Sequence, residues 1–509
     1  MKSLFRNLFV AAVSAAVSLA ALWSCTTNEK YDFSFTLPGH IVTELESTVV
    51  IPITARNITS VSVTSTPKGW TVEDVDLQNW TVTVKAPSAY TADDPTVEEN
   101  GTLKLSGFTP AGTSVTASSY LSLLNLEMDL SDKYSNCYVI SQKDTRYTID
   151  VTHKGESSET FTPDKVEVLW QSDRELVNYT SYYADKGTFT FFISHTDITD
   201  DKDNVIDSVT PDGNAVVAAY DSAGNIIWSW HIWITGSDVE STAITTSAGV
   251  FMDRNLGAYH NSDGSTDTDD IFKSYGLYYQ WGRKDPFIRP VDYNFSNNED
   301  RTVYTGSGTV KRFSYVDAEK GSDVGTLEYT VKNPMSYVLG SADNDYDWLY
   351  TSHDDNLWSS EQKSIYDPCP RGWRIPDGNA FVGMDIDQSE DLSELGDIRG
   401  MYGWHLVDTA TGTKIFMPGA GRRSFENGKL TNVNNYGYEN TPMPWVGYYW
   451  TAGIATSDRS KAQSMFFDLN TTRAVNNRYE PQKEMYRANA MQIRCVREES
   501  PTPQYRPRQ

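Results

Sequence analysis

Short runs in which apolar and polar residues alternate recur along the chain, and little of it shows the 3.6-residue period of an amphipathic helix. The clearest run is residues 80–85, Trp-Thr-Val-Thr-Val-Lys, in which Trp80, Val82 and Val84 share one face. Alternation of this kind is typical of half-buried strands bounded by turn residues. Similar runs follow at 49–53, 61–64, 103–105 and 120–126. The pattern predicts a mostly β protein that begins with a β-sandwich over residues 33–126.

A second series of strands is predicted over residues 127–240. Its last strand is the run Ile-Ile-Trp-Ser-Trp-His-Ile-Trp at 226–233, which follows a turn at Ala-Gly-Asn. Trp228 and Trp230 share one face, where two rings either fill a core or form an exposed platform for sugar stacking. Burial is favoured because the strand is bounded as a central strand would be. The segment is therefore interpreted as a second β-sandwich-like domain.

The first 24 residues have the pattern of a secretory signal peptide. Lys2 and Arg6 are followed by an almost uninterrupted apolar run at 8–22. This run is shorter than the about 20 apolar residues of a membrane-spanning helix. Leu-Trp-Ser-Cys at 22–25 resembles the lipobox of bacterial lipoproteins, whose cysteine is lipidated and becomes the new N-terminus. The alternative is a plain secreted protein in which Cys25 has no such role.

Lipidation of Cys25 predicts a membrane partner, with residues 25–32 as lipidated cysteine and linker. Each buried CH₂ contributes about 0.8 kcal/mol, so several lipid chains make a permanent anchor. The linker carries Glu29 and Asp32. An acidic patch there resembles the signal that sends lipoproteins of Bacteroides-type bacteria to the outer face. We therefore expect an outer-membrane lipoprotein at the cell surface.

Charge and motif content exclude several classes of function. The chain has 43 Lys and Arg against 68 Asp and Glu, a net charge of −25, which repels nucleic acid. It has no His-Glu-x-x-His, Gly-x-Ser-x-Gly, phosphate-binding or dinucleotide motif, and its seven histidines are not at ligand spacing. Carboxylate pairs would permit a glycoside hydrolase, but among so many acids they indicate nothing. The sequence predicts no enzyme, with a carbohydrate-active enzyme as the third hypothesis.

Several loops are rich in aspartate, at 197–207, 261–270, 341–348 and 353–356. Calcium needs several oxygen ligands on a tight loop, and none of these loops has the glycine and glutamate positions of an EF-hand. Each is most simply a solvated surface loop. The calcium candidate is the loop with Asp343, Asp345 and Asp347, beside Trp348. No other cofactor is predicted.

The last segment, residues 241–498, carries an ordered set of short motifs. These are FMDRNLGA (251–258), GLYYQWGRKDPF (276–287), DPCPRGWRIP (367–376), FMPGAGRRSFENGKL (416–430), GYYWTAG (447–453) and MQIRCVRE (491–498). As a set they resemble the Fibrobacter succinogenes major paralogous domain, found on fimbrillin-family and related surface lipoproteins of Bacteroidetes. The resemblance covers about residues 210–498. Residues 67–88 also resemble the immunoglobulin-like modules of such lipoproteins.

The Gly-Trp-Arg-x-Pro and Arg-Cys-Val-Arg elements also resemble formylglycine-generating-enzyme domains. The resemblance implies a C-type-lectin-like α+β fold for this segment. It does not imply that chemistry, because the enzyme's cysteine pair is unmatched: Cys495 stands alone in its neighbourhood. The helix that follows Arg-x-Pro in those domains is also in question here, because Gly378 falls in its first turn and Phe381 replaces a usual Trp.

Three cysteines besides Cys25 permit at most one intramolecular pair. The resemblance implies that this pair is Cys369 with Cys495. Closing a loop of about 126 residues would contribute about 4–5 kcal/mol. Cys137 would then be a buried free thiol or a partner for another group.

The stretch around Cys369 is interpreted as a rigid corner. Pro368 and Pro370 fix the backbone on either side of the cysteine. The alternative is a reactive thiol, whose pKa Arg371 and Arg374 would lower. The corner is favoured because no histidine is adjacent to act as a base.

Loops of a C-type-lectin-like scaffold carry recognition. Tyr436, Tyr438 and Trp445 lie in a Tyr-, Asn- and Pro-rich stretch and are predicted as exposed residues that stack on a ligand. The leading hypothesis is a non-catalytic binding protein, an adhesin or fimbria-associated subunit that contacts glycan or a surface protein. The rival is a structural pilus subunit joined to other fimbrial subunits by strand donation. No donor strand is evident, because the tail at 499–509 is Pro-rich and predicted to be disordered.

Overall fold

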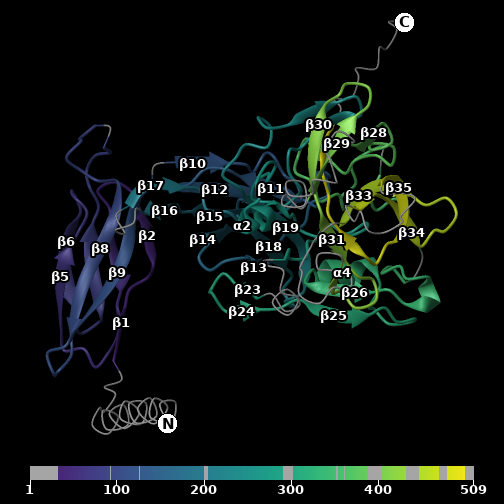
Figure 1. Ribbon diagram of the computed structural model, residues 1–509. Coiled ribbons are helices and arrows are strands. Elements are labelled where there is room, and N and C mark those ends of the chain that lie inside the picture. Colours follow the sequence, from purple (N-terminus) through teal and green to yellow (C-terminus); the bar gives the residue numbers. More distant parts are fainter. Residues whose placement is uncertain are drawn as a thin grey trace, which may run out of the picture. The chain divides into compact units, whose positions relative to one another are not determined.

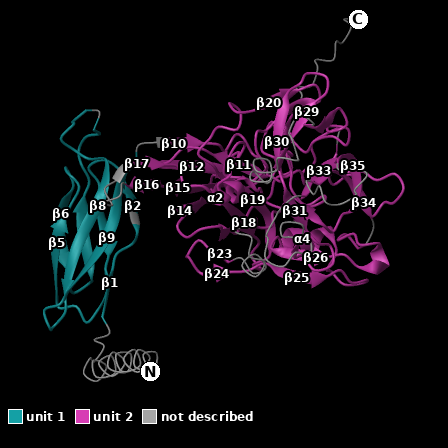
Figure 2. Cartoon of the chain, viewed as in Figure 1, with its two compact units in different colours: residues 1–125 teal, residues 126–509 magenta. Residues whose placement is uncertain are grey.

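The computed structural model describes residues 33–91, 93–124, 126–199, 205–290, 302–350, 353–359, 361–387, 403–431, 446–468 and 479–498. The chain divides into two compact units, residues 1–125 and 126–509 (Figure 2). Both consist mainly of β-strands, which confirms the mostly β prediction (Figure 1). In the described part of the chain, no helix is long and apolar enough to cross a membrane.

Unit 1 is a β-sandwich. One sheet has the order β2 (His40–Thr43), β9 (Ser114–Leu123), β8 (Asn100–Phe108), β5 (Ser60–Ser65). The other has the order β3 (Thr48–Pro52), β7 (Thr81–Lys85), β6 (Thr71–Asp76), and β1 (Ser34–Thr36) pairs separately with β4 (Thr54–Arg56). Val82 and Val84 of one sheet and Leu103 and Leu121 of the other belong to one core and are fully buried. The alternating pattern therefore faces the core as predicted.

Trp80 departs from the predicted strand. It precedes β7 and lies in the left-handed region with φ 53°, at the end of the turn between β6 and β7. The Asp76 carboxylate accepts hydrogen bonds from the backbone N–H groups of Gln78 (2.7 Å) and Asn79 (3.0 Å), which closes this turn. The indole is half-buried against the same core, so the residue packs as expected from a different backbone position.

Unit 2 begins with two sheets that pack on each other. The first has the order β10 (Leu126–Asp129), β12 (Thr145–Asp150), β15 (Thr188–Ile193), β14 (Asn178–Tyr183). The second has the order β11 (Cys137–Ile140), β19 (Ile226–Ile234), β18 (Gly213–Tyr220), β13 (Lys165–Gln171), β23 (Val303–Tyr304), β24 (Val310–Lys311). Trp228 and Trp230 are 1% and 0% exposed in the core between the sheets, which confirms that they are core residues and not a platform. A hairpin, β16 (Thr196–Thr199) and β17 (Val205–Val209), pairs separately.

The rest of unit 2 has smaller sheets and short helices. One sheet has the order β20 (Ile244–Thr246), β21 (Gly249–Phe251), β37 (Val496–Arg497), β27 (Trp373–Arg374). The largest has the order β22 (Tyr279–Gln280), β36 (Ala490–Met491), β31 (Ala420–Arg423), β33 (Val446–Ile454), β34 (Lys461–Asp468), β35 (Tyr479–Tyr486), with β32 (Leu430–Thr431) beside β31. Others are β28 (Met384–Ile386), β29 (Gly403–Asp408), β30 (Lys414–Pro418), and β25 (Ser314–Asp317) with β26 (Ser336–Leu339). The helices are α2 (Thr268–Ser274), α4 (Leu327–Lys332) and η1 (Ala342–Asn344).

The segments predicted as separate domains at 127–240 and 241–498 lie in one compact unit. Strands β23 and β24, from the second segment, extend the sheet that β11, β19, β18 and β13 of the first segment form. No helix follows the Arg-x-Pro element, and residues 378–383 form turns. Gly378 packs closely against a neighbouring strand, because an added Cβ would lie 3.0 Å from the Cα of Gly453.

Candidate binding pocket beside the disulfide corner

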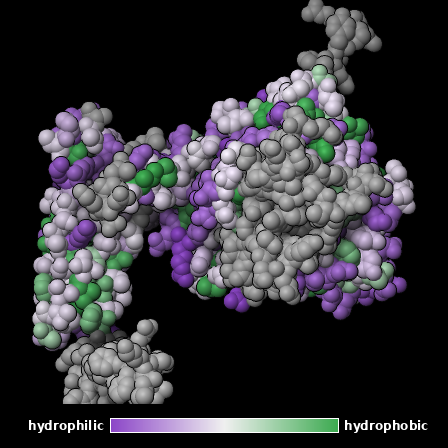
Figure 3. Space-filling view, viewed as in Figure 1, coloured by the Kyte–Doolittle hydropathy of each residue, from purple (hydrophilic) through white to green (hydrophobic). Residues whose placement is uncertain are grey.

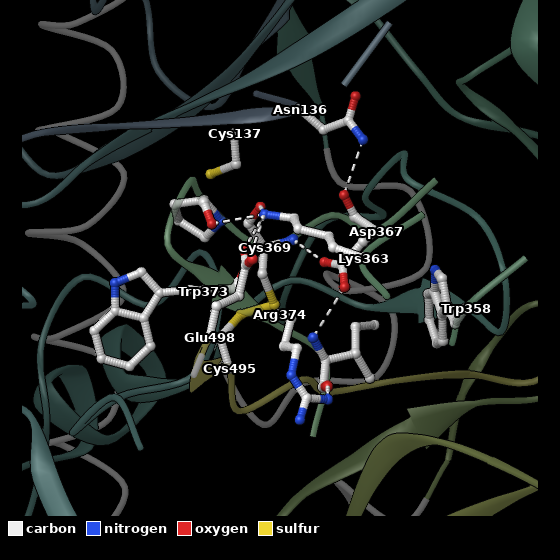
Figure 4. The surroundings of a disulfide bond; sticks show 12 residues. Asn136, Cys137, Trp358, Lys363, Asp367, Cys369, Trp373, Arg374, Cys495 and Glu498 are labelled. Atoms are coloured by element: carbon white, nitrogen blue, oxygen red, sulfur yellow. Dashed lines mark hydrogen bonds and ion pairs between the residues drawn. A yellow bond between two sulfur atoms is a disulfide. The ribbon is translucent and has the colours of Figure 1, made fainter. Parts of the chain in front are cut away.

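Cys369 and Cys495 form a disulfide, which confirms the predicted pairing (Figure 4). Their Cα atoms are 6.1 Å apart, and both residues are fully buried. Each cysteine lies close to one of two paired strands, because Trp373 of β27 is opposite Arg497 of β37. The bond therefore joins residues 367–376 to the end of the described chain, which agrees with the interpretation of this stretch as a rigid structural corner.

Lys363 organises this corner. Its ammonium donates hydrogen bonds to the backbone carbonyls of Cys369 (2.9 Å), Pro370 (2.8 Å) and Trp373 (2.7 Å), and to the Glu156 carboxylate (2.6 Å). The Lys363 side chain is 7% exposed, so the charge is held in a mostly dry position by these four acceptors. Figure 4 shows the side chain reaching toward the carbonyls beside the disulfide.

A buried carboxylate and a buried amide complete the corner. Asp367 accepts hydrogen bonds from the backbone N–H groups of Cys369 (2.8 Å) and Ile375 (3.0 Å), and burial raises the pKa of Asp367 to about 6. Asn136, just before β11, donates to the carbonyls of Ile365 (2.7 Å) and Asp367 (2.8 Å). The corner is thereby bonded to the first segment of unit 2 as well as to β37.

A pocket of about 200 Å³ opens beside the corner. Three segments that are far apart in the sequence line it, within residues 130–141, 238–240 and 370–373. Its apolar wall includes Leu130, Val139, Val239 and Pro370. Its volume is below the roughly 300–1,000 Å³ of pockets for drug-sized molecules. It therefore suits a ligand group of about one ring.

The acidic side chains of the pocket have partners within the protein. The Glu240 carboxylate accepts from the Trp373 indole N–H (2.5 Å) and pairs with Arg497 (2.6 Å). Asp238 accepts from the backbone N–H of Glu240 (3.0 Å), which leaves part of its carboxylate available. These bonds hold the segment at 238–240 against the corner.

The two cationic side chains of the pocket lack such partners. Lys133 and Arg371 are exposed, and neither forms an ion pair with a carboxylate in the described residues. The Arg371 guanidinium lies 5.6 Å from the centre of the Tyr134 ring and makes one long hydrogen bond of 3.5 Å to the carbonyl of Asp132. The pocket therefore offers hydrogen-bond donors with positive charge, although the whole chain is strongly acidic.

Cys137 also borders the pocket and is the start of a buried polar chain. Its sulfur lies 3.4 Å from Nδ1 of His231, and Nε2 of His231 lies 2.8 Å from Oδ1 of Asn214. Because Asn214 donates its own amide to the carbonyl of Gly257 (2.9 Å), its Oδ1 accepts. Nε2 of His231 then carries the proton, and Nδ1 accepts from the thiol.

Burial keeps this Cys–His–Asn chain neutral. It raises the pKa of the Cys137 thiol well above its usual range and lowers the pKa of His231 to about 3. A nucleophilic cysteine needs the opposite shifts, toward thiolate and imidazolium. The arrangement is that of a satisfied core pair, and Cys137 is the buried free thiol that the sequence predicted.

The sequence could not reveal this pair. Cys137 and His231 become neighbours because β11 pairs in parallel with β19, in a register that places Cys137 opposite His231. No spacing motif marks such a contact, since 94 residues separate the two. The pocket was missed for the same reason. Arg371 lies within a predicted motif, but Lys133 carries no signal of its own.

Tyr436, Tyr438 and Trp445 lie outside the described residues, as does Cys25. The structure therefore does not test their predicted roles in stacking and lipidation.

The three aspartates predicted to bind calcium differ in their exposure to solvent. Asp343 and Asp345 are exposed, whereas Asp347 is buried and bonds to Nδ1 of His353 (2.8 Å) and the N–H of Leu349 (3.1 Å). Burial raises the pKa of Asp347. Among the described residues, no three His, Cys, Asp or Glu side chains gather as a metal site. These three carboxylates therefore do not gather in the described structure, and calcium binding by this loop stays a prediction.

Comparison with known proteins assigns no family. No family model matches the chain, and no curated protein matches it. Among solved structures, it is similar to the I-band fragment I67–I69 from titin, at 14% identity and TM-score 0.12, over 40% of this chain and 64% of that one. It is also similar to SporoSAG from Toxoplasma gondii, at 9% identity and TM-score 0.13, over 40% and 98%. A third is the Ig1-2 module of the Drosophila receptor phosphatase DLAR, at 9% identity and TM-score 0.14, over 40% and 97%. Scores this low support no conclusion about fold or function.

Proposed function

We propose that the protein is a non-catalytic binding protein, anchored by lipid at Cys25 to the outer membrane and acting at the cell surface as an adhesin or fimbria-associated subunit. The observation that supports binding is the pocket beside the disulfide corner. Its walls are held by the disulfide and by buried hydrogen bonds, whereas Lys133 and Arg371 have no carboxylate partner in the part of the chain that the structure describes. A rigid wall with unused polar groups is what a ligand site requires.

The buried polar chemistry near the pocket favours binding over catalysis. The Cys137 thiol, the group nearest to a nucleophile, is neutral and hydrogen-bonded to a neutral imidazole. The Lys363 ammonium group is hydrogen-bonded to four acceptors at the corner. A catalytic nucleophile or base needs to be reachable and poised to change its protonation state. These groups instead maintain the shape of the pocket.

The finer architecture belongs to the same proposal. Unit 1 would be an immunoglobulin-like module, and residues 241–498 a C-type-lectin-like major paralogous domain of the kind carried by Bacteroidetes surface lipoproteins. The supporting observations are the ordered motifs of this segment and the disulfide that joins its middle to its end. In the view of Figure 3, the described surface is mostly hydrophilic or of intermediate hydropathy, and hydrophobic residues appear in small groups, which suits recognition through polar contacts.

The proposal is tested by an array of glycans and surface proteins, probed with the lipid-free chain from residue 26, with and without EDTA. The pocket variant is Lys133→Ala/Arg371→Ala. The matched control is Arg312→Ala/Lys320→Ala, which removes two exposed cations elsewhere in unit 2. Binding that the pocket variant loses and the control keeps supports the proposal.

Two outcomes would overturn the proposed function. One is no binding to any glycan or protein on the array. The other is assembly of the purified chain into filaments without ligand binding, which would favour the structural pilus subunit. A third set of variants, at Tyr436 and Trp445, tests the predicted stacking residues separately. Loss of binding in these variants alone would move the site away from the pocket.

A further inference from the structure

We infer that the pocket beside the disulfide corner binds the carboxylate of a single acidic sugar unit. The inference rests on the proposed binding function and adds the chemical class of the ligand. It depends on the hydrogen-bonding groups that the pocket leaves unused, on its size and on the charge of the chain.

The unused groups at the pocket are mainly cationic donors. An ammonium and a guanidinium can only donate, and Lys133 and Arg371 have no carboxylate partner in the described residues. Glu240, in contrast, is paired with Arg497 and with the Trp373 indole. A ligand that matches this site must therefore bring an anionic acceptor. A carboxylate that receives two charged donors is held by strong, charge-assisted hydrogen bonds.

A second feature separates sugar from other small acids. Asp238 also lines the pocket, and its carboxylate, which only accepts, is committed to one backbone N–H. A ligand that also carries a hydrogen-bond donor can use the remaining lone pairs of Asp238. The hydroxyl groups of an acidic sugar supply such donors, whereas an acidic peptide side chain ends in acceptors alone. The apolar wall formed by Leu130, Val239 and Pro370 suits the C–H face of a sugar ring.

Size and net charge restrict the ligand further. The volume of about 200 Å³ accommodates one ring, so the site would recognise a single unit and not a long chain. The net charge of −25 repels any polymer with a high density of negative charge. One carboxylate on a ligand that is otherwise neutral avoids most of this repulsion.

The test compares two ligands that differ only at the acid group. Methyl β-glucuronide carries a carboxylate where methyl β-glucoside carries a hydroxymethyl group. Titration calorimetry or ligand-observed NMR with the chain from residue 26 should show the glucuronide binding at least about tenfold more tightly, the effect expected of charge-assisted hydrogen bonds. Lys133→Ala/Arg371→Ala should remove this preference, and Arg312→Ala/Lys320→Ala should keep it. Thermal melting of each variant checks that both fold.

Three results would overturn the inference. The first is equal affinity of the native chain for the two sugars, and the second is a preference for the glucuronide that survives in the pocket variant. The third is tighter binding of cyclohexanecarboxylate, a ring acid with one carboxylate and no hydroxyl groups, than of the glucuronide. Each of these results concerns only the class of ligand. If the chain still binds a glycan or protein on the array, and the pocket variant loses that binding, the proposed binding function stands although the acidic-sugar inference has failed.

Discussion

The disulfide between Cys369 and Cys495 should contribute about 5 kcal/mol to the stability of unit 2. The bond closes a loop with a sequence separation of 126 residues. In the chain-entropy model, a loop of that length removes about 16 cal/mol/K from the unfolded state, which is about 5 kcal/mol at 25 °C. With an m-value of about 3 kcal/mol/M, loss of the bond should lower the urea midpoint by about 1.7 M.

The assay is urea unfolding followed by tryptophan fluorescence, in which Trp228, Trp230 and Trp373 make unit 2 the main source of signal. Oxidised protein, reduced protein and Cys369→Ala/Cys495→Ala are compared. The alanine variant should unfold slightly earlier than reduced protein, because both cysteines are fully buried and their removal leaves voids.

The matched control for this assay is Cys137→Ala, which removes a buried thiol and its bond to His231 but closes no loop. It should shift the midpoint much less than loss of the disulfide. Equal midpoints for oxidised and reduced protein would refute the reasoning. The corner would then be held by Lys363 and Asp367 alone, and the long loop would add nothing to stability.

Three further predictions follow from buried groups. Leu103→Ala removes a fully buried side chain from the core of unit 1 and should destabilise that unit by about 2–5 kcal/mol. Calorimetry should show a lower melting temperature for the transition of unit 1. An unchanged melting curve would contradict the described core. Asp367 has a folded-state pKa of about 6, above its ordinary value of 3.8. Its protonated form therefore stabilises the fold at low pH, and this contribution is lost as the pH rises from about 4 through about 6. The free energy of unfolding should fall by about 3 kcal/mol at most over this range. Urea midpoints across this range should fall more steeply for the native chain than for Asp367→Asn, and identical slopes would contradict the assignment. The Cys137 thiol, neutral and buried, should react with a disulfide reagent such as DTNB only as fast as unit 2 opens, whereas rapid stoichiometric reaction without denaturant would show that the pocket exposes it.

Local pattern and motif were enough for some features. Alternation placed Val82 and Val84 in a core, and strand boundaries placed Trp228 and Trp230 in another. The family resemblance gave the disulfide. These features depend on the side-chain period of a strand or on an ordered set of motifs, both of which can be read from one sequence.

Features that depend on distant pairing could not be predicted. Parallel pairs such as β2 with β9, β10 with β12 and β11 with β19 are set by packing of whole sheets, and nothing local marks their register. The pairing of β23 with β13 joins two segments that the sequence had indicated as separate domains. The pocket arises from the same long-range contacts, since its three walls come from segments more than a motif's length apart.

The corner and the pocket are one structural feature with two consequences. Lys363 and Asp367 form hydrogen bonds with backbone carbonyl and N–H groups of the corner, and the disulfide joins the corner to the segment of β37. Residues 370–373 are therefore already ordered, and they lose little conformational entropy when a ligand binds. Substitution of Lys363 would leave buried carbonyls unpaired and affect folding before binding. Among the described residues, the Lys133 side chain takes part in no such network, and Arg371 makes one long hydrogen bond and one ring contact. They are therefore the positions at which binding can be changed while the fold is kept, and substitution of these two tests the site without testing the scaffold.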